Sequence, residues 1–122
     1  MDTELKEQLL KILTELPSEN SYLDYKEAPY KQENMAEFIK DVCAFLNCTE
    51  SYEKDKFIII GVIDKSRYKK GINENPMPDD KYFQDLCDFI QPRPHIETGD
   101  IEFEKRKYGY IYISKDNYKW YN

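Results

Sequence analysis

One run of apolar residues constrains the fold more than any other feature of the sequence. Residues 57–63 read Phe-Ile-Ile-Ile-Gly-Val-Ile, and Asp64 ends the run. A strand that is covered on both faces is apolar throughout, whereas a half-exposed strand alternates polar and apolar residues. Seven residues are also far fewer than the ~20 that a membrane-spanning helix needs. The run therefore predicts a central strand that is covered on both sides.

Three helices are predicted from apolar residues that recur at spacings of three and four. The first has Thr3 as its N-cap and ends before Pro17. The second covers about residues 34–47, and the third is capped by Asp79 or Asp80. The residues expected to face inward are Leu5, Leu9, Ile12, Leu13, Leu16, Met35, Phe38, Ile39, Val42, Phe45, Leu46, Tyr82, Phe83, Leu86, Cys87, Phe89 and Ile90.

Alternation of polar and apolar residues predicts the remaining strands. One covers residues 21–27, and a hairpin takes up the last third of the chain. Its first strand contains Ile101 and Phe103, residues 105–107 make the turn, and residues 108–113 return. The sequence thus predicts an α+β fold, with residues 1–122 as one domain. We expect a mixed β-sheet of about four or more strands with three helices packed on it.

Composition narrows the class of protein. With 40% hydrophobic and 15% aromatic residues, the chain has enough apolar surface to fold. Three cysteines and one histidine are too few for a disulfide framework or a zinc site. The first residues are acidic and precede no apolar segment of the secretory type. We therefore expect a cytoplasmic protein with reduced thiols and no membrane association.

Charge is unevenly placed along the chain, whose formal net charge is −6. Residues 1–55 contain 6 basic and 13 acidic residues, whereas residues 56–122 contain 12 and 11. A protein that coats DNA obtains its affinity by neutralising phosphates, so the overall balance argues against that simple role.

Three acidic residues occupy positions where carboxylates can do chemistry. Asp24 lies inside a predicted strand, Asp64 lies where the buried strand emerges, and Glu19 precedes the first strand. If the two strands are neighbours, the three could converge on a hard cation such as Mg²⁺ or Mn²⁺. Lys26 projects from the same strand face as Asp24 and could contact a phosphate. On spacing alone, the favoured interpretation is that Asp24 and Lys26 lie on a solvated strand face and that Asp64 begins a turn.

The order of several short motifs changes this weighing. Glu19-Asn20-Ser21-Tyr22-Leu23-Asp24-Tyr25-Lys26 resembles the entry motif of the Schlafen AlbA-type domain family. Ala44-Phe45-Leu46-Asn47 resembles its A-F-x-N helix end, and residues 58–64 resemble its hydrophobic strand. The family's V-x-G step after that strand is similar to Lys70-Gly71-Ile72, and the I-x-P that closes its third helix is similar to Ile90-Gln91-Pro92. The resemblance covers roughly residues 15–114.

Two departures from the family pattern stand out. Residues 48–56 lack the glycine pair that family members usually have between the A-F-x-N motif and the central strand. Asp24 stands where glutamate is usual, which shortens that side chain by one methylene.

The resemblance implies two functions. The first is a nucleic-acid-binding or regulatory module, which in bacterial relatives serves transcriptional control or defence against phage. The second is a metal-dependent endoribonuclease that cleaves structured RNA such as tRNA, with Glu19, Asp24 and Asp64 as Mg²⁺ or Mn²⁺ ligands and Lys26 on the phosphate. We place binding or regulation first; a purely protein-binding role is a third alternative.

In either of the first two cases the partner is RNA or DNA, gripped by two basic segments. Tyr68 lies within the first segment and could stack on an unpaired base. A homodimer and additional C-terminal domains both remain open. The expected binding residues are Lys65, Arg67, Tyr68, Lys69, Lys70, Lys105, Arg106 and Lys107.

Overall fold

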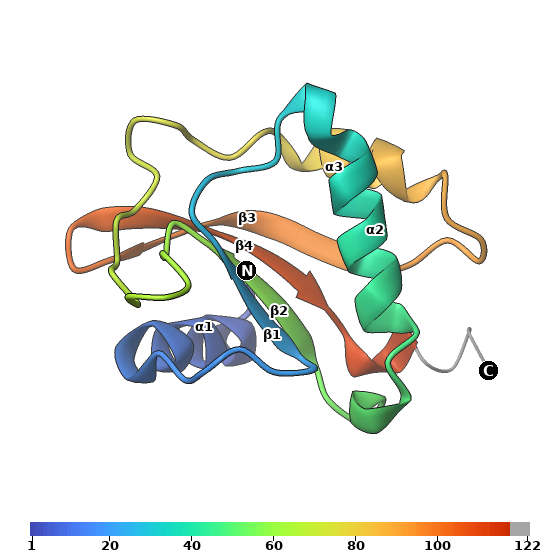
Figure 1. Cartoon of the computed structure of the whole chain (residues 1–122), viewed down its shortest axis with the longest axis horizontal. Coiled ribbons are helices and arrows are strands. Elements are labelled where there is room, and N and C mark those ends of the chain that lie inside the picture. Colours follow the sequence, from blue (N-terminus) through green and yellow to red (C-terminus); the bar gives the residue numbers. More distant parts are fainter. Residues whose placement is uncertain (118–122) are drawn as a thin grey trace.

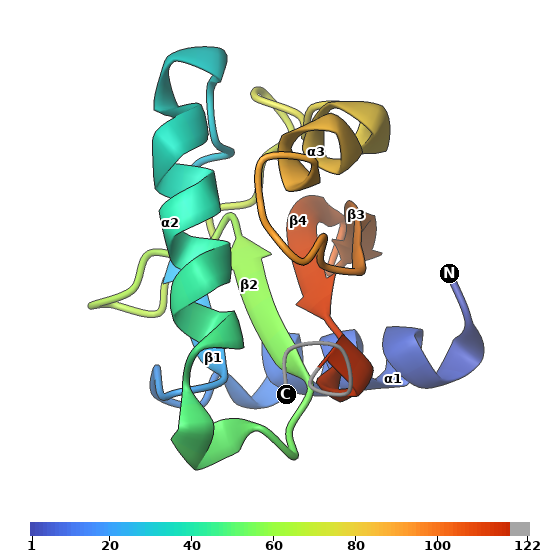
Figure 2. The same ribbon diagram turned by 90° about the vertical axis from the view of Figure 1, so that its right-hand side faces the viewer.

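The computed structural model describes residues 1–117 as one α+β domain, in which three α-helices enclose a four-stranded mixed sheet. Figure 1 and Figure 2 show α1 below the sheet, with α2 and α3 on its opposite face. The strand order is β1-β2-β4-β3, with β1 parallel to β2 and the other pairs antiparallel. The elements are α1 (Thr3–Glu15), β1 (Leu23–Lys26), α2 (Met35–Leu46), β2 (Lys56–Ile60), α3 (Asp80–Cys87), β3 (Ile96–Phe103) and β4 (Arg106–Ile113).

Strand β2 is central and buried on both faces, as its apolar run predicts. Ile58 and Ile60 join the core under α2 and α3, whereas Phe57 and Ile59 join the core over α1. The strand ends at Ile60, earlier than the apolar run does. Gly61 follows with φ +109°, a left-handed conformation that directs the chain out of the sheet.

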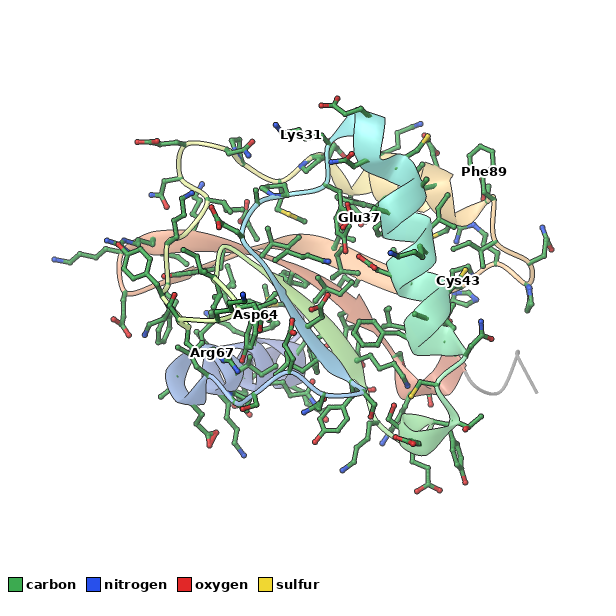
Figure 3. All side chains as sticks on the ribbon, viewed as in Figure 1. Lys31, Glu37, Cys43, Asp64, Arg67 and Phe89 are labelled. Atoms are coloured by element: carbon green, nitrogen blue, oxygen red, sulfur yellow. The ribbon has the colours of Figure 1, made fainter. Side chains whose placement is uncertain are left out.

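The predicted helical stripes are largely confirmed, with three corrections. The N-cap of α1 is Asp2 and not Thr3, because the Asp2 carboxylate accepts a hydrogen bond from the Leu5 amide at 2.8 Å. Met35 is the first residue of α2; it is 38% exposed and does not face inward, because the helix first contacts the core one turn later, at Phe38. Phe89 is 72% exposed and does not face inward either. Helix α3 ends at Cys87, and the Phe89 amide then donates to the Leu86 carbonyl, a tighter turn that breaks the helical period. Figure 3 shows the Phe89 side chain pointing away from the domain.

The C-terminal hairpin is longer than predicted and its turn lies elsewhere. Strand β3 begins at Ile96 and pairs with β4 along its whole length. The turn consists of Glu104 and Lys105, not residues 105–107, and both have positive φ, as a tight two-residue hairpin turn requires. Strand β3 lies at the edge of the sheet, and buried and exposed side chains alternate only weakly in its first half. The sequence pattern therefore did not predict that half.

Within residues 1–117, no helix is long and apolar enough to cross a membrane. Cys43, Cys48 and Cys87 form no disulfide among the described residues.

Candidate carboxylate cluster and basic surface

The parallel pairing of β1 with β2 brings the three predicted acids together. Asp24 lies on β1, Asp64 follows β2, and Glu19 lies in the segment between α1 and β1. The Glu19 Oε2 atom accepts a hydrogen bond from the Tyr25 amide at 2.8 Å. Because β1 is an edge strand, this bond satisfies a backbone donor that no neighbouring strand can reach.

The Glu19 carboxyl group lies close enough to the carboxyl groups of Asp24 and Asp64 for both to influence its pKa. The contact with Asp24 is the largest influence on the pKa of Glu19; together with partial burial it raises that pKa, while the Tyr25 amide and Asp64 oppose the rise. A hydrogen bond between two carboxyl groups needs a shared proton, so the raised pKa is the physical consequence of this crowding. We call Glu19, Asp24 and Asp64 the carboxylate cluster.

The carboxylate cluster does not fit a divalent metal as it is arranged. Among residues 1–117, no group of three or more histidine, cysteine, aspartate or glutamate side chains is positioned to hold a metal ion. The aspartates are also directed at cations of the chain: Asp24 lies 3.5 Å from Lys26 Nζ, and Asp64 lies 3.5 Å from Arg67 Nη1. Figure 3 shows Asp64 and Arg67 side by side near β1.

Lys26 has partners that the sequence analysis did not identify. Its ammonium lies 3.5 Å from Asp24, 3.6 Å from Glu37 and 3.4 Å from Asp41. Burial lowers the pKa of Lys26, but the surrounding carboxylates outweigh burial and raise it above its ordinary value. Asp41 also accepts a hydrogen bond from the Tyr30 hydroxyl at 2.7 Å.

One sequence signal could have found these partners. Glu37 and Asp41 are four residues apart on α2 and therefore share one helix face, which packs over β1. Their carboxylates hold the Lys26 side chain, so a phosphate that approached Lys26 would have to displace two acidic groups of α2 as well as Asp24.

The two basic segments predicted from the sequence form a single surface. The Arg106 guanidinium donates to the Lys69 carbonyl and lies 5.8 Å from the ring centre of Tyr68. The Ile72 amide donates to the Lys107 carbonyl at 2.7 Å. Figure 1 shows this loop beside the turn of the β3–β4 hairpin. We call residues 65–70 and 105–107 together the basic surface.

A glycine permits this close approach of the two segments. Gly71 has φ +77°, and a Cβ atom there would lie 3.1 Å from Arg106 Cβ and 3.2 Å from the Lys107 carbonyl oxygen. Any larger residue would push the loop away from the hairpin.

Some cations of the basic surface are paired and some are not. Lys69 lies 2.9 Å from Glu104 and Lys70 lies 3.0 Å from Glu27. Lys65, Lys105 and Lys107 are exposed and form no ion pair with another of the first 117 residues. The basic surface therefore retains positive charge that is available to an anion.

Arg67 connects the basic surface to the carboxylate cluster. Its guanidinium pairs with Asp64 and lies 5.4 Å from the ring centre of Tyr25. Its Nε atom is buried without a hydrogen-bond partner in the described chain. Tyr68, the next residue, is 53% exposed, so its ring is accessible for stacking.

The fold and these two features define a class of protein: an α+β domain in which a cluster of acids borders a basic surface. The family model described as "Schlafen, AlbA_2" matches residues 19–122, and the chain belongs to that family. Membership supports a nucleic-acid-related domain. Comparison with curated proteins gives no match. Comparison with solved structures gives none either.

Proposed function

We propose that this protein is a nucleic-acid-binding module that contacts the phosphate backbone through its basic surface. The observation that carries the proposal is the union of two basic segments, 35 or more residues apart, through the Arg106 bond to Lys69. Cations that gather on one face release counterions when they bind phosphates, which is the main source of sequence-independent affinity.

The unpaired lysines are the residues on which this affinity is expected to depend. Lys65 comes from the loop after β2, and Lys105 and Lys107 come from the hairpin. Because no carboxylate of the described chain neutralises them, each can contact a phosphate without first breaking an ion pair. Contacts of this kind position a protein on the backbone but read no sequence.

The experiment is a binding titration by fluorescence anisotropy with tRNA and with duplex DNA, over a series of salt concentrations. We expect Lys65→Gln, Lys105→Gln and Lys107→Gln, made together, to weaken binding and to reduce the slope of log K against log salt by about 2 to 3. The matched control is Lys6→Gln, Lys11→Gln and Lys40→Gln, which removes the same charge from exposed positions on α1 and α2. Equal losses in both triple variants, or no binding by the unmodified protein, would contradict the proposal.

The endoribonuclease alternative is favoured by one observation, the contact of Glu19 with Asp24 and Asp64. Against it, the carboxylates as arranged do not fit a divalent ion, so we propose binding without cleavage. The test is incubation of tRNA with the protein in Mg²⁺ or Mn²⁺, with and without EDTA. We expect intact tRNA. Fragments that require metal, and that an Asp24→Asn, Asp64→Asn double variant fails to produce, would establish the ribonuclease instead.

A further inference from the structure

One exposed aromatic ring lies on the basic surface. Among the first 117 residues, the exposed aromatic side chains are those of Tyr22, Tyr52, Tyr68 and Phe89, and Tyr68 alone belongs to the basic surface. Its exposed fraction is 53%. Single exposed apolar residues are common on protein surfaces, so exposure alone indicates no ligand. What matters is how the ring is held and what surrounds it.

Hydrogen bonds hold the backbone of Tyr68 on both sides. Its amide donates to the Ser66 hydroxyl at 3.2 Å. Its carbonyl accepts from the Ile63 amide at 3.0 Å and from the Lys70 amide at 3.1 Å. The loop therefore fixes the point from which the ring projects. Because the backbone is already ordered, less conformational freedom is lost when a ligand stacks on the ring.

The guanidinium of Arg106 supports the ring itself. It lies 5.8 Å from the ring centre of Tyr68, and its Nη1 atom donates to the Tyr68 hydroxyl at 3.5 Å. The same Nη1 atom donates to the Lys69 carbonyl, which attaches Arg106 to the loop. A guanidinium carries five donor hydrogens, so these bonds leave donors for a phosphate. Tyr68 and Arg106 thus present an aromatic face beside a cation.

Arg106 also lines a hollow of about 560 Å³. The other cations of this hollow are Lys70, which pairs with Glu27 at 3.0 Å, and Lys105, which forms no ion pair in the described chain. Its acidic residues are Glu27 and Glu74, so the three cations are in excess. A phosphate adjoining a base on the Tyr68 ring would therefore meet positive charge.

We propose that the basic surface binds a single-stranded segment of nucleic acid, with one unpaired base stacked on Tyr68 and a neighbouring phosphate at Arg106. The inference rests on the proposed function and assigns its substrate class. A base inside a duplex is stacked on its neighbours and presents only its edge, so a ring on the protein surface cannot stack on it. An unpaired base offers its face, and every base has one, so stacking selects a single strand without reading its sequence.

The critical comparison is Tyr68→Leu against Tyr68→Phe. Both variants lose the hydroxyl and its bond to Arg106, but only Phe keeps an aromatic face, so their difference measures the ring. In fluorescence anisotropy with oligo(dT), we expect Tyr68→Leu to bind about fivefold or more weakly than Tyr68→Phe, the loss of one base–aromatic stack. The two variants should bind the duplex of oligo(dT) with oligo(dA) equally. Tyr22→Leu is the matched control, since it removes an exposed ring outside the basic surface and should bind both forms as the unmodified protein does.

A third probe separates stacking from a change in the shape of the surface. An oligonucleotide with abasic sites in place of thymidines keeps the phosphates and lacks the bases. Tyr68→Leu and Tyr68→Phe should bind it equally, because it offers nothing to stack. Weaker binding of Tyr68→Leu to the abasic strand or to the duplex would overturn the inference, since the ring would then act by supporting the surface.

The outcomes separate this inference from the proposed function. If Tyr68→Leu and Tyr68→Phe bind oligo(dT) equally while the lysine triple variant binds weakly, the stacking inference is overturned and the basic surface stands. Binding of the duplex but not of oligo(dT) by the unmodified protein has the same consequence. If the unmodified protein binds none of the three probes, both proposals fail.

Discussion

Replacing Lys26 by glutamine tests whether the ammonium of this residue, and not a metal ion, neutralises the acids around it. The Lys26 side chain is 27% exposed and lies 3.4 to 3.6 Å from Asp24, Glu37 and Asp41. Glutamine keeps the length of most of the side chain and removes the charge. The three carboxylates then face one another with no cation between them.

The magnitude follows from these distances. At ~3.5 Å a single ion pair is worth about 1.2 kcal/mol in a dielectric constant of 80 and about 4.7 kcal/mol in one of 20. Burial of the ammonium opposes this attraction, as its effect on the Lys26 pKa shows, and the partners are partly exposed. A net loss of about 1 to 2 kcal/mol in the free energy of unfolding is therefore expected, between the values for exposed and for buried pairs.

Urea denaturation at neutral pH measures this loss. Lys70→Gln is the matched control, because Lys70 has one ion pair, with Glu27 at 3.0 Å, and both side chains are more than half exposed. Its removal should change stability by less than about 1 kcal/mol. A Lys26→Gln protein as stable as the control would refute the reasoning. So would stabilisation of the unmodified protein by millimolar Mn²⁺ that is abolished in Asp24→Asn, since it would show that the cluster accepts a metal.

The pH dependence of the same interaction has a definite sign. The folded protein raises the pKa of Lys26, so the stabilisation is fully present below the pKa of the unfolded chain, about 10.5. It is lost as the pH rises through the folded value. The difference in stability between the unmodified protein and Lys26→Gln should therefore be constant around neutral pH and decline only in the alkaline range.

Three further predictions concern the fold and the cluster. Phe83→Ala should lower the free energy of unfolding by about 3 to 5 kcal/mol in urea, because Phe83 is fully buried, whereas Phe89→Ala should change it by less than about 0.5 kcal/mol. Gly109→Ala should destabilise by about 1 to 3 kcal/mol, since the new Cβ overlaps the Met77 side chain, and Met77→Ala in the same chain should recover part of that loss. The raised pKa of Glu19 means that its charged form is disfavoured in the folded state. The unmodified protein should therefore lose stability relative to Glu19→Gln as the pH rises above 4.5. Urea midpoints at a series of pH values measure this difference.

The sequence predicted those features that depend on local periodicity. The apolar run of β2 and the stripes on α1, α2 and α3 were readable because burial on a regular element repeats with the geometry of that element. The prediction that Phe89 faces inward was wrong because α3 ends two residues earlier and the chain then turns more tightly, so the helical period no longer applies. The hairpin turn was wrong because Glu104 and Lys105 adopt positive φ without glycine or asparagine to indicate it.

The sequence predicted convergence of the carboxylates only on the condition that two strands are neighbours. Glu19, Asp24 and Asp64 could meet if β1 and β2 were neighbours, and the parallel pairing supplies that condition. The position of each carboxyl group depends on side chains from other elements. Arg67 pairs with Asp64 three residues away in the same loop, whereas α2, a separate element, brings two more acids to Lys26. No local pattern contains the information that α2 packs beside β1.

The pairing of charges also explains why binding and the carboxylate cluster can be separated by experiment. A phosphate that approached Arg67 would come close to Asp64 and, through it, to Glu19, so like charges would oppose the contact. Other cations of the basic surface, Lys70, Lys105 and Arg106, are not paired with an acid of the carboxylate cluster. Neutralising the carboxylate cluster should therefore strengthen general electrostatic attraction slightly, whereas neutralising these three cations should weaken it. Opposite signs for these two sets of variants on one binding isotherm would place the nucleic acid on the hairpin side of the basic surface. Weaker binding in both sets would contradict the argument, because removal of repulsive charges predicts a gain.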